Sequence, residues 1–392
     1  MPSGILCLFS AKGGFQRMQF NNTLHGVRGI AALLVLVYHW HGPFPAAVRA
    51  LEKFQFLGIS FDLGIIIRMG WIGVDWFFVL SGYVLASTLW ERRLTIMEVM
   101  QFWKRRILRI FPALWLQLVV LVPILYAVGV FSGFNWEQFF KSAVLWLRPL
   151  PQGVRSYNGV YWTLVVELSF YLFLPFLLLL FRRTNIWFVI FLAALVQLFG
   201  QFGWLLVPVF DHTYFVLRSV YPFLAGVQLA FVVGLALNHF RLHLSDRQRY
   251  LWLLVFILLY FFMLWLLNHY KSEIPRGHWA PLIWRMSMAL IIAGIIFAIL
   301  NPLKGIGWLS SGIMVWLGDI SYGIYLWHLP VQSLTARLLP GPWSTPMGSV
   351  AALLLTTAIT FAVASLSYYL VERPILNRFA GRRRVGEGGA TR

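Results

Sequence analysis

Cysteine is almost absent from this sequence, because Cys7 is the only one in 392 residues. A single cysteine cannot form a disulfide within the chain, so a disulfide-stapled scaffold is excluded and no oxidising compartment is implied. Charge is scarce as well: charged residues make up 11% of the chain, and 13 acidic residues stand against 32 lysines and arginines.

Several motifs of well-known enzyme classes are also missing. The sequence has no glycine-rich nucleotide-binding loop, no nucleophile-elbow serine and no zinc-protease histidine pair. His239 and His243 have the spacing of two helical metal ligands, but the basic segment NHFRLHLSDRQR around them offers no obvious third ligand. We therefore predict no metal site.

Apolar residues dominate what is present. Hydrophobic residues account for 60% of the chain and aromatic residues for 17%, with a mean hydropathy of +0.75. A soluble domain cannot bury that much apolar surface, so we predict an all-α fold, a polytopic integral membrane bundle of about ten transmembrane helices. The expected spans lie near 24–43, 71–90, 110–130, 160–181, 186–208, 215–237, 250–267, 283–301, 313–338 and 349–371.

The basic residues indicate an orientation. If both termini are cytoplasmic, most lysines and arginines fall in segments on the cytoplasmic side, as the positive-inside rule requires. The net charge of +19 then needs no nucleic acid, and membrane lipid is the expected partner. We divide the chain into an N-terminal tail (1–23), a membrane domain (24–375) and a basic cytoplasmic tail (376–392). Met18 lies just ahead of the first span, so the first seventeen residues are consistent with an extension from an upstream start codon.

Two polar residues bracket the apolar run in VRGIAALLVLVYHW. Arg28 and His39 are eleven residues apart, three helical turns to within about 20°, so both side chains project from one face. A cation near the cytoplasmic mouth suits phosphate, and a histidine at depth suits proton transfer. Their axial separation of about 16 Å resembles the reach of a pantetheine arm whose nucleotide stays at the surface.

Other ionisable groups within spans are costly unless they face the bundle interior. Asp75 fits a charge partner for a cation or histidine, or a carboxylate favoured by the helix dipole. Arg106 and Arg109 share a helical face, which fits a phosphate site or, from spacing alone, a cytoplasmic anchor. Glu167 needs a partner in its apolar span, and a histidine from another span is the simplest candidate.

A polar stripe runs along the ninth expected span. Ser321, Tyr325, His328 and Gln332 are spaced by four, three and four residues, which places them on one helix face. Such a stripe lines a cavity or forms a helix contact. The tripeptide ERP (372–374) is expected to stop the last helix and cap it at the cytoplasmic surface.

Taken together and in this order, these segments resemble acyltransferase family 3, the multi-span bacterial membrane O-acyltransferases. The matching segments are RGIAALLVLVYH (28–39), GVDWFFVLSGY (73–83), RRILRIFPALW (105–115), YWTLVVELSFYL (161–172), ISYGIYLWH (320–328) and ERP (372–374). Trp76 and Phe111 depart from the family pattern, where an aliphatic residue and a tyrosine are expected.

The resemblance implies an enzyme of the bacterial inner membrane that moves an acyl group from cytoplasmic acyl-CoA, most commonly acetyl-CoA, to a hydroxyl of a carbohydrate or natural product. It implies the stand-alone branch, without a fused hydrolase-like domain, and no tightly bound cofactor. His39 is then the central catalytic residue, as general base or as transient acyl carrier, and Arg28 helps to hold the donor.

With that function, the remaining candidates take roles as hypotheses. Arg106 and Arg109 join Arg28 on the CoA phosphates, and Glu167 orients or charge-balances His39. The predicted acceptor-side residues are Asp75, Ser321, Tyr325 and His328. The alternative from another class is a transporter or flippase for a glycan or lipid, although we find no inverted repeat.

Overall fold

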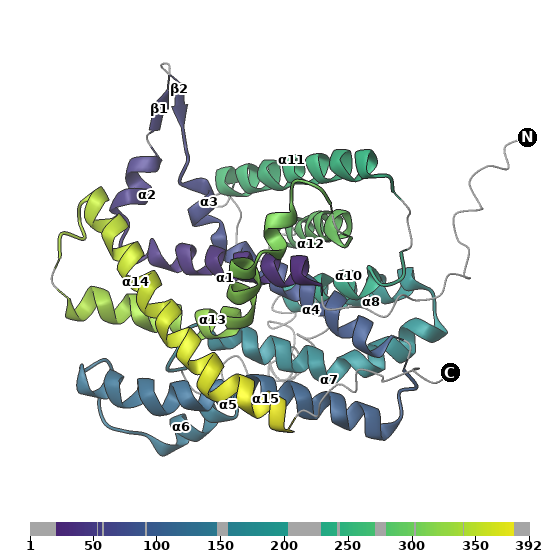
Figure 1. Ribbon diagram of the computed structural model, residues 1–392, viewed down its shortest axis with the longest axis horizontal. Coiled ribbons are helices and arrows are strands. Elements are labelled where there is room, and N and C mark those ends of the chain that lie inside the picture. Colours follow the sequence, from purple (N-terminus) through teal and green to yellow (C-terminus); the bar gives the residue numbers. More distant parts are fainter. Residues whose placement is uncertain are drawn as a thin grey trace, which may run out of the picture.

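The computed structural model describes residues 21–52, 54–56, 59–90, 92–146, 156–202, 229–240, 244–270, 280–301, 303–339 and 341–379, and helices dominate them (Figure 1). In the first half these are α1 (Asn22–Trp40), α2 (Ala46–Leu51), α3 (Ile65–Arg68), the 3-10 turn η1 (Gly70–Ile72), α4 (Gly73–Leu89), α5 (Ile96–Ala127), α6 (Trp136–Ala143), α7 (Tyr161–Arg183) and α8 (Ile186–Phe202). In the second half they are α10 (Leu229–Ala236), α11 (Asp246–Tyr270), α12 (Ala280–Ile299), the 3-10 turn η4 (Gly307–Ser310), α13 (Gly312–Leu338), α14 (Pro346–Ser367), the π-helical turn η5 (Tyr368–Glu372) and α15 (Arg373–Phe379).

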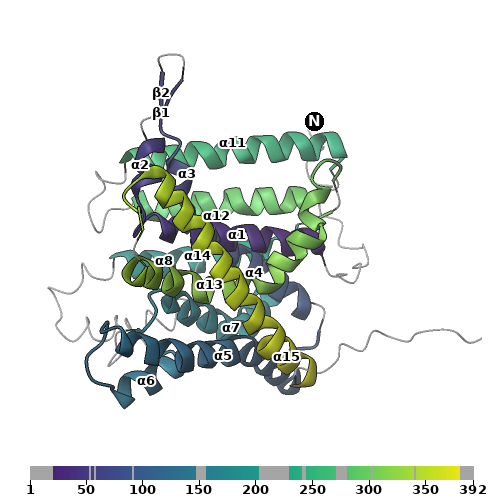
Figure 2. The ribbon, with the colours of Figure 1, turned by 60° about the vertical axis from the view of Figure 1, so that its left-hand side comes forward.

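One small β-hairpin accompanies the helices. Strands β1 (Phe54–Phe56) and β2 (Ile59–Phe61) pair antiparallel, with Phe54 opposite Phe61. Seen from two sides, α11 and α12 form one edge of the molecule, and α5 with α6 forms the opposite edge (Figure 2).

Five helical stretches of the described chain are long and apolar enough to cross a membrane, which agrees with an all-α membrane protein. They are Gly70–Leu89, Ile96–Ala127, Tyr161–Arg183, Asp246–Tyr270 and Pro346–Phe379. The first and ninth expected spans are also helical, as α1 and α13, but they are more polar and are not among the five. The number of about ten spans stays a prediction. Residues 215–228 of the sixth expected span, like the tails at 1–20 and 380–392, lie outside the described residues.

Two helix boundaries differ from the prediction. Helix α5 begins at Ile96, well before the expected 110, because the Thr95 hydroxyl caps it by accepting from the Glu98 N–H. The last helix does not stop at residues 372–374: it continues through η5 into α15 and ends at Phe379. Pro374 is tolerated because it lies just after a π-helical turn, at the start of the new α-helical segment.

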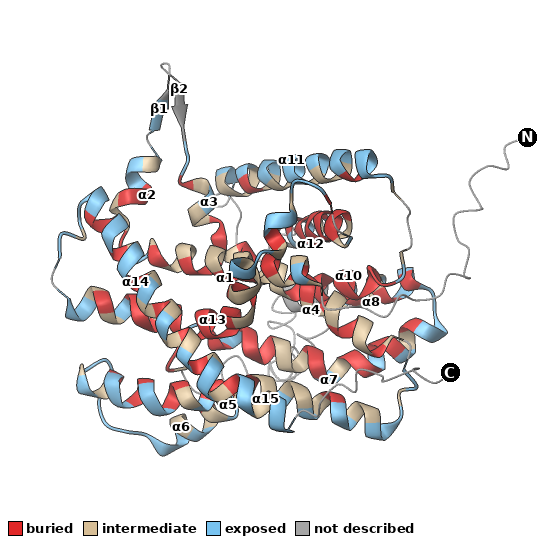
Figure 3. Cartoon of the chain, viewed as in Figure 1, coloured by how far each residue is buried: buried red, intermediate tan, exposed pale blue. Residues whose placement is uncertain are grey.

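Burial follows the expected membrane pattern (Figure 3). In α11 only 6% of the apolar window is buried, whereas in α7 the share is 56%. An apolar helix with its surface turned outward is what contact with lipid requires, while α10 and α13 lie in the interior.

Helices α1 and α13 pack side by side at the centre of the bundle. Small residues bring their backbones close: a Cβ on Gly318 would lie 2.3 Å from the His25 carbonyl oxygen, and one on Gly29 would lie 2.8 Å from the Leu317 Cβ. Further along, the Gln332 side-chain amide donates to the Leu36 carbonyl at 2.9 Å. This packing fixes the register of the two helices.

A proline in α13 is compensated by neighbouring side chains. Pro330 has no N–H, so the Leu326 carbonyl four residues earlier lacks its helical donor. The side-chain amides of Gln117 and Asn158 donate to this oxygen at 2.5 and 2.8 Å, and the Tyr161 hydroxyl donates to Gln117 Oε1 at 2.7 Å. These bonds tie α13 to α5 and to the start of α7.

Replacing Gly318 by valine should separate α1 from α13, because the new side chain would overlap the backbone at His25. We expect a loss of about 1–3 kcal/mol in stability, read as a lower unfolding temperature of the detergent-solubilised protein. Gly312→Val on the same helix is the control, since a Cβ there has no neighbour within 4 Å among the described residues. Equal destabilisation by the two variants would contradict the role of Gly318 in this packing.

Candidate active site

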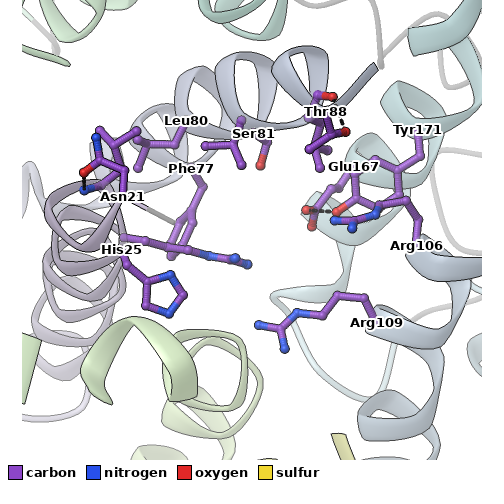
Figure 4. A pocket seen from close by; sticks show the side chains of 14 residues that line it. Asn21, His25, Phe77, Leu80, Ser81, Thr88, Arg106, Arg109, Glu167 and Tyr171 are labelled. Carbon is purple, nitrogen blue, oxygen red and sulfur yellow. Dashed lines mark hydrogen bonds between the residues drawn. The ribbon is translucent and has the colours of Figure 1, made fainter. Parts of the chain in front are cut away.

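A cavity of about 200 Å³ lies between α1, α4, α5 and α7 (Figure 4). Its lining residues are Asn21, Leu24, His25, Arg28, Phe77, Leu80, Ser81, Val84, Leu85, Thr88, Arg106, Arg109, Glu167 and Tyr171. Three of them are arginines from two helices that are distant in sequence. The fold therefore brings all three predicted donor-binding arginines to one cavity.

Glu167 lies among these cations. The Tyr171 hydroxyl donates to Glu167 Oε1, and the Arg106 guanidinium lies over the rings of Phe102 and Tyr171, at 5.8 and 5.9 Å from their centroids. Figure 4 shows Arg106, Glu167 and Tyr171 together on one side of the cavity. Arg106 Nε is buried and has no hydrogen-bond partner among the described residues.

Arg109 is held by a buried carboxylate. Its Nη1 lies 3.1 Å from Glu372 Oε2, and the Glu372 side chain is only 1% exposed. The Ser367 hydroxyl donates to the other carboxylate oxygen at 3.3 Å, and the guanidinium lies 5.6 Å from the Tyr322 ring centroid. Glu372, expected only to cap a helix at the surface, instead positions an arginine of the cavity.

Arg28 differs from Arg109 in its surroundings. Its guanidinium lies 6.0 Å from the centroid of the Phe77 ring, and no ion pair of Arg28 occurs within the described part of the chain. An arginine inside a cavity without a tight carboxylate partner suits an anionic ligand.

His39 and His328 form a pair where α1 meets α13. His328 Nε2 lies 3.1 Å from His39 Nδ1, and the ring centroids are 4.9 Å apart. Each Nδ1 also lies 3.0 Å from the carbonyl oxygen four residues earlier in its own helix, Val35 for His39 and Ile324 for His328.

These contacts assign the hydrogens of the two rings. A carbonyl oxygen only accepts, so each Nδ1 carries the hydrogen, and the Nε2 of neutral His328 accepts from His39. In neutral His39 the lone pair then resides on Nε2, which has no hydrogen-bond partner among the described residues. This is the tautomer that a general base requires.

The structure does not bring Glu167 to His39, contrary to the expected pairing. Glu167 bonds to Tyr171, and the hydrogen-bond partners of His39 are the Val35 carbonyl and His328. The physical reason is that this half-buried carboxylate lies in the cavity with three guanidiniums, which balance its charge without a histidine. The sequence argument considered only a histidine.

Three of the four predicted acceptor-side residues, Ser321, Tyr325 and His328, lie on α13, and Asp75 lies on α4. Asp75 lies in the first turn of α4, with Arg285 as its opposite charge, and Ser321 donates to the Gly318 carbonyl of its own helix at 2.7 Å. The Tyr325 hydroxyl lies 2.7 Å from Thr163 Oγ1 and donates to the Val160 carbonyl oxygen at 3.1 Å. Their role in acceptor binding, and that of His328, stays a prediction.

His25 and Asp319 are site residues that sequence reasoning missed. His25 lines the cavity, and its Nε2 lies 2.8 Å from Asp319 Oδ1. His25 precedes Arg28 by three residues and shares its helix face, which was the available signal. As for metals, no three His, Cys, Asp or Glu side chains cluster within the described ranges, and His243 lies outside them.

The chain is similar in sequence to several known proteins. The chain is 27% identical to the peptidoglycan O-acetyltransferase OatA of Listeria monocytogenes, over 92% of this chain and 57% of that protein. It is 28% identical to the putative peptidoglycan O-acetyltransferase YrhL of Bacillus subtilis, over 90% of this chain and 54% of the relative. The chain thus spans little more than half the length of these relatives.

A third relative has a more similar length. The putative acetyltransferase ORF330 of Acidianus two-tailed virus is 26% identical, over 85% of this chain and 90% of that protein. No solved structure matches the chain. Residues 21–365 match the family model of an acyltransferase domain. This range includes every cavity-lining residue as well as His39 and His328. The chain belongs to acyltransferase family 3.

Proposed function

We propose that this acyltransferase takes an acetyl group from acetyl-CoA at the arginine-lined cavity and transfers it to a hydroxyl of a saccharide, with His39 as the central catalytic residue. The observation that carries the proposal is the arrangement along α1. Arg28 meets two further arginines, Arg106 and Arg109, in the cavity. His39, whose Nε2 has no hydrogen-bond partner among the described residues, lies eleven residues further along α1. Eleven residues of helix span about 16 Å, a distance suited to an extended pantetheine arm.

The charge of the cavity supports an anionic donor. Arg28, Arg106 and Arg109 face two carboxylates, Glu167 in the cavity and Glu372 behind Arg109, so positive charge exceeds negative charge among these five groups. Guanidinium groups bind phosphate through paired N–H donors, which fits the diphosphate of CoA. Glu167 is then the counter-charge that keeps Arg106 in place before the donor binds.

The histidine pair supports acid–base chemistry at the other end of the path. His39 Nε2 removes the proton of the acceptor hydroxyl as that oxygen attacks the thioester carbonyl. The carbon–sulfur bond breaks, the new ester carries the acetyl group, and the proton passes from His39 to the leaving thiolate. Transfer through an acyl-histidine would use the same nitrogen. His328 acts as a positioning residue, because its Nε2 accepts the hydrogen on His39 Nδ1.

The acceptor and the orientation are further parts of the proposal. OatA and YrhL are named for peptidoglycan O-acetylation, which supports a surface polysaccharide or lipid-linked glycan as acceptor. A ten-span topology in the bacterial inner membrane, with both termini cytoplasmic, would open the arginine cavity toward cytoplasmic acetyl-CoA. The transporter alternative loses its support because the chain belongs to an acyltransferase family.

His39→Ala should reduce acetyl transfer at least about 100-fold, since the proposed general base is lost. The measurement is release of CoA and formation of labelled acetyl-glycan from labelled acetyl-CoA, in membranes supplied with a glycan extract. His41→Ala, which removes another half-buried histidine two residues away, is the control. Normal transfer by folded His39→Ala would refute the assignment.

His328→Leu should lower kcat about 10- to 100-fold and leave the KM for acetyl-CoA near the wild-type value, because positioning of His39 affects the chemical step and not donor binding. Steady-state kinetics at saturating acceptor measure both constants. A raised KM with unchanged kcat would instead assign His328 to binding.

Arg28→Ala should raise the KM for acetyl-CoA about tenfold or more, because a charged hydrogen bond to phosphate contributes about 1.5–3 kcal/mol. Arg183→Ala is the matched control, since Arg183 is exposed at the end of α7 and outside the cavity. If both variants keep the wild-type KM, Arg28 does not bind the donor.

A further inference from the structure

The arginine-lined cavity stops before it reaches the catalytic pair. On α1 its lining ends at Arg28, and on α4 it ends at Phe77. His39 lies three further helical turns along α1 and is not part of the lining. A group bound between the arginines must therefore pass the end of the cavity to meet His39.

Aromatic rings occupy the space between the two places. Phe77 meets Tyr325 edge to face, with centroids 6.1 Å apart. Tyr325 in turn lies 5.8 Å from the ring of His328, which is 4.9 Å from that of His39. The contacts run without interruption from the guanidinium of Arg28, over the Phe77 ring, to the catalytic pair.

The two rings are held differently. Tyr325 is buried, and its hydroxyl is bonded to Thr163 and to a backbone carbonyl, so its ring is fixed. Phe77 is half-buried, has no polar anchor and forms part of the cavity wall (Figure 4). Of the two rings, Phe77 is therefore the one that no hydrogen bond holds in place.

We infer that Phe77, backed by Tyr325, limits the size of the acyl group that passes from the arginine-lined cavity to His39. The inference rests on the proposed function, in which the thioester moves along this path. An acetyl group carries one methyl beyond the carbonyl, whereas a butyryl group adds two methylenes that must pass the same ring. An apolar pocket that discriminates by size commonly separates donors differing by one methylene about 10- to 200-fold.

The test compares acetyl-CoA and butyryl-CoA as donors for the wild type, Phe77→Ala, Phe77→Trp and Phe78→Ala. Phe78 is the matched control, because its ring stacks on Phe231 of α10, with centroids 4.5 Å apart, away from the path. Size-exclusion profiles in detergent confirm that each variant is folded. The quantity measured is the ratio of kcat/KM for butyryl transfer to that for acetyl transfer.

We expect Phe77→Ala to raise this ratio about tenfold or more, Phe77→Trp to lower it, and Phe78→Ala to keep the wild-type value. Acetyl transfer by the wild type tests the proposed function separately, so its absence overturns that proposal first and this inference with it. If the wild type transfers acetyl but the ratio is the same in all Phe77 variants, Phe77 does not select by size. A folded Phe77→Ala that transfers neither group also overturns the inference, since a wider path should admit more donors.

Discussion

The close packing of α1 on α13 is the constraint on which the site depends. Glycines at the contact let the two backbones approach, with the α13 backbone at Gly318 against the α1 backbone at His25. Once that register is fixed, His39 and His328 meet 289 positions apart in sequence, and each ring is oriented by a carbonyl of its own helix. A wider separation of the helices would break the contact between His39 and His328 and leave His328 Nε2 without this partner in an apolar interior.

Elsewhere in the bundle, buried backbone carbonyls are also bonded by side chains from neighbouring segments. Proline residues inside helices release carbonyl oxygens, and side chains of neighbouring helices occupy them: Gln117 and Asn158 at the Leu326 carbonyl, and the Trp103 indole at the Tyr171 carbonyl four residues before Pro175. Because water is scarce in such an interior, each of these hydrogen bonds holds neighbouring segments together in a defined orientation.

Positive and negative charges are unequal around the cavity. Glu372 and Glu167 do not neutralise the arginines completely. Glu372 forms an ion pair with Arg109, and Glu167 accepts a hydrogen bond from Tyr171 in the same cavity as Arg106. Arg28 keeps an aromatic neighbour in place of a tight ion pair. A pre-oriented group of cations with spare donors is a better anion site than cations that are fully paired, because binding then needs no ion pair to break.

The sequence by itself determined the class of the molecule and most of the candidate residues. Hydropathy alone required a helical membrane protein, and the eleven-residue interval placed Arg28 and His39 on one face because helical periodicity is a local property. The order and spacing of short motifs were enough to identify the family, because each motif lies within a single helix or at its end.

Only the tertiary structure decided the partners. It bonded Glu167 to Tyr171 beside the arginines and not to His39. It also buried Glu372 against Arg109, paired His39 with His328, and added His25 to the cavity. Such pairings depend on the relative rotation and depth of helices that lie far apart in the chain. A one-dimensional pattern shows which face of a helix is polar, but it contains no information on which polar face of another helix packs against it.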